Sequence, residues 1–381
     1  MARYVMPLQT AALLFPLIAL ALTVPYMVSQ YRRYGAVLFL RTLCVYSFVF
    51  YLMCCYCLVI LPLPERSNAA AFYAPWRCNL VPFSYLPDLL AESTQLVWSD
   101  PRTYLPALLS SGLYDPVFNI VMLIPFGIYL RYYFQQGWRR TAALAFALSL
   151  FFEITQLTGL YFLYPAPYRL CDVNDLISNT LGGLAGWGLT PLITRFLPSR
   201  RRLDERARER GSRVTYTRRL VAFLFDAPAM AALAALAAFC LPAWPLKPLL
   251  AAWLAAFVYH GLGVYWTGGR TLGKALVRIR VADQGGGRVS LPQALLRALL
   301  LHGLCHGLSV ALTGAGEAAP WEQPVYMLAG LTSLAFWGAG FVCAAQGKPM
   351  WYERLTATTQ VSTVQRQPSH QQQKEAPLHD L

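Results

Sequence analysis

Nine apolar stretches, each long enough to cross a lipid bilayer as a helix, constrain the fold of this chain more than any other feature. A bilayer core requires about 20 predominantly apolar residues per helix. Only 13% of the residues are charged, whereas soluble domains carry about 25%. The sequence therefore excludes a soluble enzyme and predicts an all-α, polytopic transmembrane helical bundle. The predicted spans lie at 7–29, 41–62, 112–131, 141–163, 175–195, 219–242, 247–266, 292–312 and 324–345.

The basic residues gather in the loops on one side of these spans. The loops after spans one, three, five, seven and nine are basic, and the segment from Arg195 to Arg219 holds ten arginines against Asp204, Glu205 and Glu209. Because basic loops stay in the cytoplasm, we expect the N-terminus outside and the C-terminus in the cytoplasm. The net charge of +14 is then a consequence of topology, and nucleic acid is excluded as a partner.

The arginine-rich segment also divides the chain into two units of five and four spans. Its composition is compatible with a helix, which either lies against anionic headgroups or is a solvated connector. Beyond Thr363 the sequence has almost nothing to bury, which predicts disorder. We expect an N-terminal span with its loop at 1–34, a transmembrane domain at 35–196, a cytoplasmic linker at 197–213, a second transmembrane domain at 214–345 and a disordered cytoplasmic tail at 346–381.

Polar residues inside the predicted spans of the first unit are candidates for function, because polar groups are costly in a membrane. Glu153 and Gln156 share one face of span four. Asn119 and Glu153 both lie about 10 Å below the outer surface, so they can meet at one depth. Asp172 and Asp175 precede span five, where carboxylates suit a helix N-terminus. Capping explains Asp175, but it does not explain why Asn119 and Glu153 converge on the same leaflet.

The order of short motifs in this unit resembles the VanZ-like membrane protein family. The matching segments are AsnLeuValProPhe, Asn119 with ProPheGly, GluIleThrGln, TyrArgLeuCysAspValAsnAsp and SerAsnThrLeuGlyGly, within about residues 35–195. The resemblance implies a cell-envelope protein of the bacterial cytoplasmic membrane that is connected with resistance to glycopeptides such as teicoplanin. The positions that match the family's polar signature are Asn79, Asn119, Glu153, Gln156, Arg169, Asp172, Asp175 and Asn179.

This signature predicts a binding site for a polar lipid headgroup or a cell-wall precursor. Arg77 or Arg169 would hold a phosphate through a bidentate fork. Enzymatic chemistry with Glu153, Asp172 or Asp175 as acid or base is an alternative, and a purely structural polar cluster is another. The sequence has no convincing nucleophile with its base and no zinc or phosphate-loop spacing, so we expect no cofactor or metal. The expected partners are membrane lipids, a lipid-linked precursor or glycopeptide, and envelope enzymes.

Two further features of the first unit concern its assembly. Cys78 and Cys171 fall in predicted outer loops, each within a signature motif, and a disulfide between them would join these loops in an oxidising exterior. Gly182 and Gly186 have the small-residue spacing of tight helix packing. The sequence thus predicts one covalent and one packing constraint.

The second half contains an intramembrane acid, Asp226, seven residues after Arg219. Seven residues are about two helical turns, so the two side chains share a face. The segment ThrGlyGlyArgThrLeuGlyLys follows span seven, and alternating apolar positions at 276–281 predict a short amphipathic or strand-like element that ends in a glycine turn. Together these features resemble the RDD family, small membrane domains named for an Arg and two Asp, over about 214–345.

The RDD resemblance assigns Arg219 and Asp226 to an intramembrane polar pair and Asp283 to the second acidic position. Transport has been suggested for this family, so the alternative function of the chain is ion or solute transport that uses buried Glu153 and Asp226. A transporter normally shows internal repeats or interrupted helices. A structural role for Asp226, paired with another span, is the competing interpretation.

Overall fold

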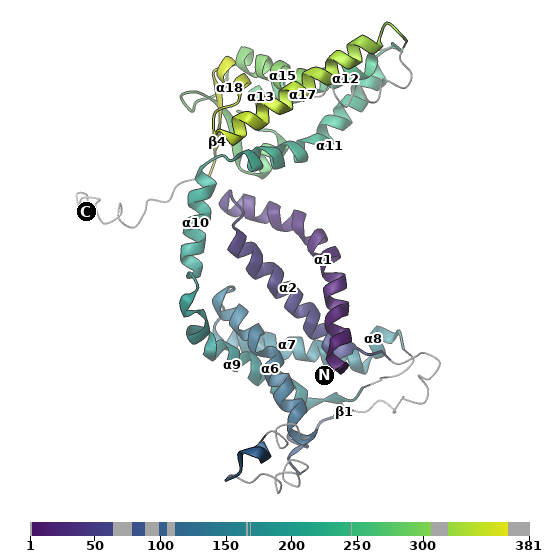
Figure 1. Cartoon of the computed structure of the whole chain (residues 1–381), viewed down its shortest axis with the longest axis vertical. Helices are drawn as coiled ribbons and strands as arrows, with labels where there is room; N and C mark the ends of the chain where they lie inside the picture. Colours follow the sequence, from purple (N-terminus) through teal and green to yellow (C-terminus); the bar gives the residue numbers. More distant parts are fainter. Residues whose placement is uncertain are drawn as a thin grey trace, which may run out of the picture. The chain divides into compact units, whose positions relative to one another are not determined.

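The described part of the chain folds into helices with two short two-stranded sheets, as predicted for an all-α protein (Figure 1). The structure is a computed structural model. It divides into two compact units, one of Met1–Thr23 with Phe39–Leu203 and one of Val24–Leu38 with Asp204–Leu381. It describes residues 2–63, 78–87, 99–104, 111–164, 167, 169–244, 246–305 and 319–364.

The first unit is built on helices that coincide with the first five predicted spans. Its core contains Leu123, Phe126, Ala145 and Phe152, which are buried among aromatic side chains. A parallel pair of two-residue strands, β1 and β2, joins two loops. The elements are α1 (Ala2–Tyr34), α2 (Phe39–Ile60), β1 (Cys78–Asn79), η1 (Pro101–Thr103), α6 (Ser111–Tyr132), α7 (Trp138–Leu157), α8 (Gly159–Phe162), β2 (Cys171–Asp172), α9 (Val173–Ile193) and η2 (Thr194–Phe196). The last part of α1, from Val24, belongs to the second unit.

Helices α6 and α9 pack with their backbones in close approach. A Cβ atom on Gly182 would lie 2.2 Å from the Ile120 carbonyl oxygen, and one on Gly186 would lie 1.9 Å from the Ile124 oxygen. A Cβ on Gly127 of α6 would in turn meet the backbone of α9. The predicted packing role of Gly182 and Gly186 is confirmed, because only hydrogen fits between these helices.

The second unit consists of the other four predicted spans and a small antiparallel sheet. The predicted strand-like element is β3, and the glycine turn follows it. The seventh predicted span is continuous from α12 through the π-helical turn η3 to α13. The elements are α10 (Arg200–Ser212), α11 (Tyr216–Cys240), α12 (Lys247–Ala256), η3 (Phe257–Leu262), α13 (Gly263–Trp266), α14 (Leu272–Leu276), β3 (Ile279–Asp283), α15 (Leu291–Cys305), α17 (Gln323–Ala345), α18 (Trp351–Leu355) and β4 (Thr358–Ser362).

The predicted disordered tail at 346–381 is wrong for its first part. Helix α18 and strand β4 form there, and β4 pairs with β3 from Asp283 opposite Thr358 to Ile279 opposite Ser362. The pairing is physically reasonable because β3 would otherwise expose a row of unpaired backbone groups. The rest of the predicted tail, from residue 365, lies outside the described residues.

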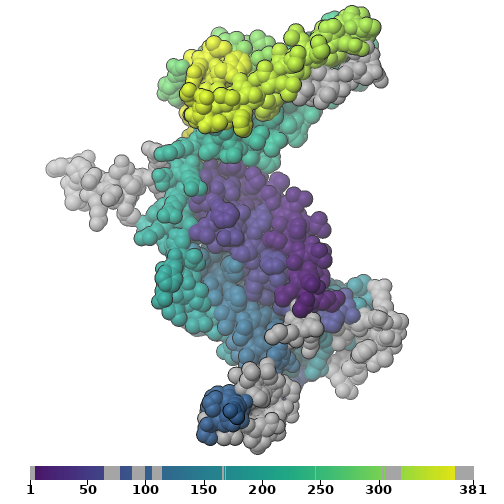
Figure 2. Space-filling view, viewed as in Figure 1, coloured from purple at the N-terminus to yellow at the C-terminus, as the bar shows by residue number. Residues whose placement is uncertain are grey.

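Six helices of the described residues are long and apolar enough to cross a membrane. The other three predicted spans correspond to the helices α6, α9 and α15, and the last part of the span at 292–312, from residue 306, lies outside the described residues. Helix α17 lies at the surface of the second unit in Figure 2 and exposes Met327, Leu331, Leu334 and Phe341. Large exposed apolar side chains of this kind suit contact with lipid. The six spans are Val5–Tyr34, Phe39–Ile60, Trp138–Leu157, Tyr216–Cys240, Lys247–Trp266 and Gln323–Ala345.

Candidate functional site

A polar cavity of about 560 Å³ lies in the first unit, between the end of α2, the loop after β1, and helices α6, α7 and α9. The local sequence of each element supplies one part of it. Most of the polar signature from the sequence meets here, although the signature residues come from separate segments of the chain. The polar side chains that line the cavity are Ser84, Tyr85, Asp115, Asn119, Glu153, Gln156, Arg169, Asp172, Asn174, Asp175 and Asn179.

Asp172 links three elements at the outer part of the cavity. It is the N-cap of α9, where its Oδ1 accepts the Asn174 amide at 2.8 Å. Its own backbone N–H donates to Glu153 Oε2 at 2.9 Å. Asn79 lies opposite Asp172 in the β1–β2 pair and donates to both of its carboxylate oxygens at 3.1 Å. Asp172 thus caps α9 with its carboxylate, which also holds Asn79 of β1, and it holds Glu153 through its backbone N–H.

Deeper in the cavity, amide side chains join the three helices. Asn119 Nδ2 of α6 donates to Asp175 Oδ1 of α9 at 2.7 Å. Asn179 Nδ2 donates to Ser149 Oγ of α7 at 2.9 Å, and Ser149 donates to the Asp175 carbonyl oxygen at 3.2 Å. Asn119 and Glu153 both line this cavity.

Arg169 is placed differently from the predicted phosphate fork. Its Nη1 donates to the Val59 carbonyl oxygen at 2.9 Å and its Nη2 to that of Leu61 at 3.4 Å. Gln156 Nε2 also donates to Val59, at 3.0 Å. Both side chains therefore satisfy carbonyl groups at the C-terminal end of α2, where a positive charge is favourable. Arg77, the other predicted phosphate ligand, lies outside the described residues.

The predicted disulfide is not formed. Cys78 and Cys171 are free thiols, although the β1–β2 register makes them Cα partners. Burial, together with the hydrogen bond to Cys78, raises the pKa of Cys171 to about 12. Because the thiolate is the reactive form, this shift disfavours reaction of Cys171 at neutral pH.

Sequence reasoning did not assign Asn174 and Asp115 to the site. Asn174 is 5% exposed, accepts the Phe83 amide at 2.5 Å and donates to Ser84 Oγ at 2.9 Å. It thereby holds the loop after β1 over α9. The available signal for Asn174 was its place between Asp172 and Asp175 in a quoted motif, whereas Asp115 lies inside predicted span three, close to its outer end.

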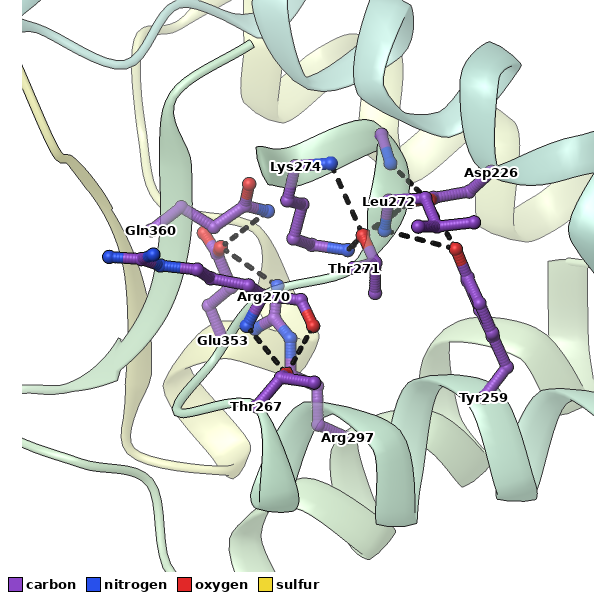
Figure 3. Close-up of polar contacts among 11 residues, drawn as sticks. Asp226, Tyr259, Thr267, Arg270, Thr271, Leu272, Lys274, Arg297, Glu353 and Gln360 are labelled. Carbon is purple, nitrogen blue, oxygen red and sulfur yellow. Dashed lines mark hydrogen bonds and ion pairs between the residues drawn. The ribbon is translucent and has the colours of Figure 1, made fainter. Parts of the chain in front are cut away.

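In the second unit, Asp226 is 1% exposed and fully engaged by neighbouring groups (Figure 3). Its carboxylate accepts hydrogen bonds from Tyr259 Oη at 2.8 Å, Thr271 Oγ1 at 2.6 Å and the Gly273 amide at 2.7 Å. Lys274 Nζ lies 3.7 Å from Asp226 Oδ2, and burial lowers the pKa of Lys274 to about 8. The loop after span seven is thus fastened to α11 through one carboxylate.

Arg219 and Asp226, the predicted intramembrane polar pair, bind different partners. Arg219 Nη1 binds Glu353 Oε2 at 2.8 Å, and two helical turns separate Arg219 from Asp226 by about 10 Å along α11. The fully buried arginine is its neighbour Arg218, which donates to the carbonyl oxygens of Val277 and Arg278 at 2.7 Å. Asp283 accepts the Gly287 amide at 2.6 Å and so closes the glycine turn.

Glu353 predicts how the second unit responds to acid. Burial alone would raise its pKa, but Arg297, at 3.4 Å, and Arg219 hold it below the usual 4.5. The unfolded state then binds the proton more tightly, so the stabilisation is complete above pH 4.5 and is lost as the pH falls through the folded-state pKa. We expect the unfolding midpoint of the full chain to drop over this acid range. In Glu353→Gln that part of the drop should be absent; an unchanged profile would contradict the assignment.

The family comparisons agree with the two units. The VanZ/LLP1 family model matches residues 48–194, and the RDD family model matches residues 213–349. Among curated proteins no match is found, and no solved structure matches the chain. VanZ domains are linked to glycopeptide resistance, and both domains indicate a membrane protein. The chain is therefore a membrane protein that joins a VanZ-like domain to an RDD family domain.

Proposed function

We propose that the VanZ-like unit recognises a polar lipid headgroup or a lipid-linked cell-wall precursor at the outer face of the membrane. This recognition would contribute to resistance to teicoplanin-type glycopeptides. The observation that carries the proposal is the cavity of about 560 Å³ in which polar groups of α6, α7, α9 and the β1 loop converge. A concave site with a few fixed polar groups is the usual form of a small-ligand site.

The contacts around the cavity favour binding over a purely structural cluster. Asp172 and Asn174 hold the loop after β1 in place, and Asn119 and Asn179 join the helices. Even with these bonds made, the cavity is wide enough for a headgroup. A cluster that served packing alone would be expected to close around its polar groups, because protein interiors are densely packed.

Transport that uses Asp226 is less well supported. The Asp226 carboxylate already binds four protein groups, at 2.6 to 3.7 Å. A carboxylate satisfied in this way is typical of a structural anchor. Envelope enzymes remain expected partners. A chain that served as a scaffold for such an enzyme would need neither Glu153 nor Asp226 for chemistry of its own.

The test of the proposed function is the antibiotic susceptibility of a sensitive Gram-positive host that expresses the full chain. Glu153→Gln, and Asp172→Asn combined with Asp175→Asn, should lower teicoplanin tolerance to that of the host alone, because they remove carboxyl groups that line the cavity. Asp226→Asn should keep the tolerance. Membrane levels are matched by blot, and vancomycin is measured in parallel.

The matched control is Asp100→Asn, an outer-loop carboxylate that caps η1 and is not among the residues that line the cavity. It should leave tolerance unchanged. Tolerance that survives the cavity variants at equal membrane levels, or that depends on Asp226 instead, would refute the proposal and favour ion-flux assays in vesicles.

A further inference from the structure

We propose that the group bound in the VanZ-like cavity is a primary ammonium, and that a phosphate is not the recognised group. This inference rests on the proposed function and names the ligand class of the same site. The ammonium can belong to a lipid headgroup or to the amino group of a cell-wall peptide, since the two present the same chemistry. Three features of the cavity lead to it.

The first feature is charge. Among the described residues that line the cavity, Asp115, Glu153, Asp172 and Asp175 carry carboxyl groups, and Arg169 alone carries a cation. The Arg169 guanidinium is directed to backbone carbonyl groups of α2, with Nη1 at 2.9 Å and Nη2 at 3.4 Å. An anionic ligand would therefore face an excess of negative charge, whereas a cation would reduce it.

The second feature is the direction of the amide groups. The amide nitrogens of Asn119, Asn174, Asn179 and Gln156 all donate to acceptors of the protein. Each of these amides thus uses at least one of its two N–H donors internally, within or between the elements that frame the cavity. A phosphate accepts hydrogen bonds and would need free donors, while an ammonium brings three donors of its own.

The third feature is a buried acceptor without a partner. Asn179 is 3% exposed and lines the cavity, and its Oδ1 makes no hydrogen bond. The orientation of this amide is set by Ser149, whose hydroxyl donates to the Asp175 carbonyl and so accepts from Asn179 Nδ2. The unpaired atom is therefore the oxygen. A buried acceptor left unsatisfied is unfavourable, so a donor from the ligand would complete it.

A metal cation would also suit negative charge, but the geometry does not favour it. In the described part of the chain no group of three or more His, Cys, Asp or Glu side chains is arranged to hold a metal ion. The carboxyl groups instead surround a space of about 560 Å³. An organic ammonium on a larger headgroup or peptide fits that space better than a bare ion.

The experiment measures binding to the purified full chain in detergent by native mass spectrometry. The lipid probes are short-chain phosphatidylethanolamine, its N-acetylated form and phosphatidylglycerol. The peptide probes are a lysine-containing peptide and the same peptide acetylated on the lysine amine. At least one free amine should bind about tenfold more tightly than its acetylated form, as expected for a charge-assisted hydrogen bond. Glu153→Gln and Asp175→Asn should remove the preference, while Asp100→Asn should keep it.

The comparison of free and acetylated probes uses the wild-type chain, so it does not depend on whether a variant folds. A preference for the amine lipid alone identifies a headgroup as the source, and one for the peptide amine alone identifies the cell-wall peptide; either supports the inference. Equal binding of acetylated probes, tighter binding of phosphatidylglycerol or no binding at all overturns it. If Glu153→Gln abolishes teicoplanin tolerance while acetylation has no effect, the proposed function stands and this inference fails. If the chain prefers the free amine but Glu153→Gln does not change teicoplanin tolerance, this inference stands and the proposed function fails.

Discussion

Gly186→Leu is expected to prevent the VanZ-like unit from folding. A Cβ atom at Gly186 would lie 1.9 Å from the Ile124 carbonyl oxygen and 2.8 Å from its carbon, so the obstacle is the backbone of α6. Overpacking a core typically costs about 1 to 3 kcal/mol when side chains can move, and a backbone contact leaves less room to relax. We expect a large loss of monodisperse protein in size-exclusion chromatography and a much lower unfolding midpoint.

The same helix provides the control for this prediction. A Cβ on Gly188, two residues further along α9, would meet no atom within 4 Å. Gly188→Leu should therefore behave like the wild type, although both substitutions add the same apolar side chain to one helix. An unfolding midpoint of Gly186→Leu equal to that of Gly188→Leu would refute the close approach of α6 and α9.

The close approach of α6 and α9 also illustrates what could be predicted from the sequence. Span length requires helices, and the spacing of Gly182 and Gly186 indicates a tight contact. The rise along each helix predicts one depth for Asn119 and Glu153, and both side chains line the cavity. Such properties follow from residues close together in sequence, or from a regular rise along a helix.

Contacts between distant segments could not be predicted in this way. Arg169 binds the end of α2 across 110 residues, and no local pattern distinguishes that role from phosphate binding. The pairing of β3 with β4 depends in the same way on a segment far along the chain, and so does the ion pair of buried Glu353 with Arg297. Arg218 and Arg219 are adjacent and chemically identical, so only the packing of α11 decides which one is buried.

Asp226→Leu is expected to destabilise the RDD unit by about 3 to 5 kcal/mol, the usual effect of removing one partner of a buried ion pair. The substitution leaves Lys274, which is 7% exposed, without its carboxylate, and it leaves the Gly273 amide and the Thr271 hydroxyl without an acceptor. The measurement is the unfolding midpoint of the full chain in detergent. A midpoint equal to that of the wild type would contradict the structural role of Asp226.

The double variant Asp226→Leu with Lys274→Met separates the charge from the other contacts. It removes the buried ammonium as well, so it should be more stable than Asp226→Leu alone, because replacing both partners avoids an unpaired charge.

The pH dependence of the unfolding free energy gives a second check. The pKa of Lys274 is about 8 in the fold and 10.5 in the unfolded chain, so wild-type stability should rise with pH between these values. In Asp226→Leu the rise should begin at lower pH, since the carboxylate that favours the ammonium is gone, and in the double variant this rise should be absent. A transport role would instead predict a loss of flux in Asp226→Asn, which keeps the shape of the side chain and removes its charge.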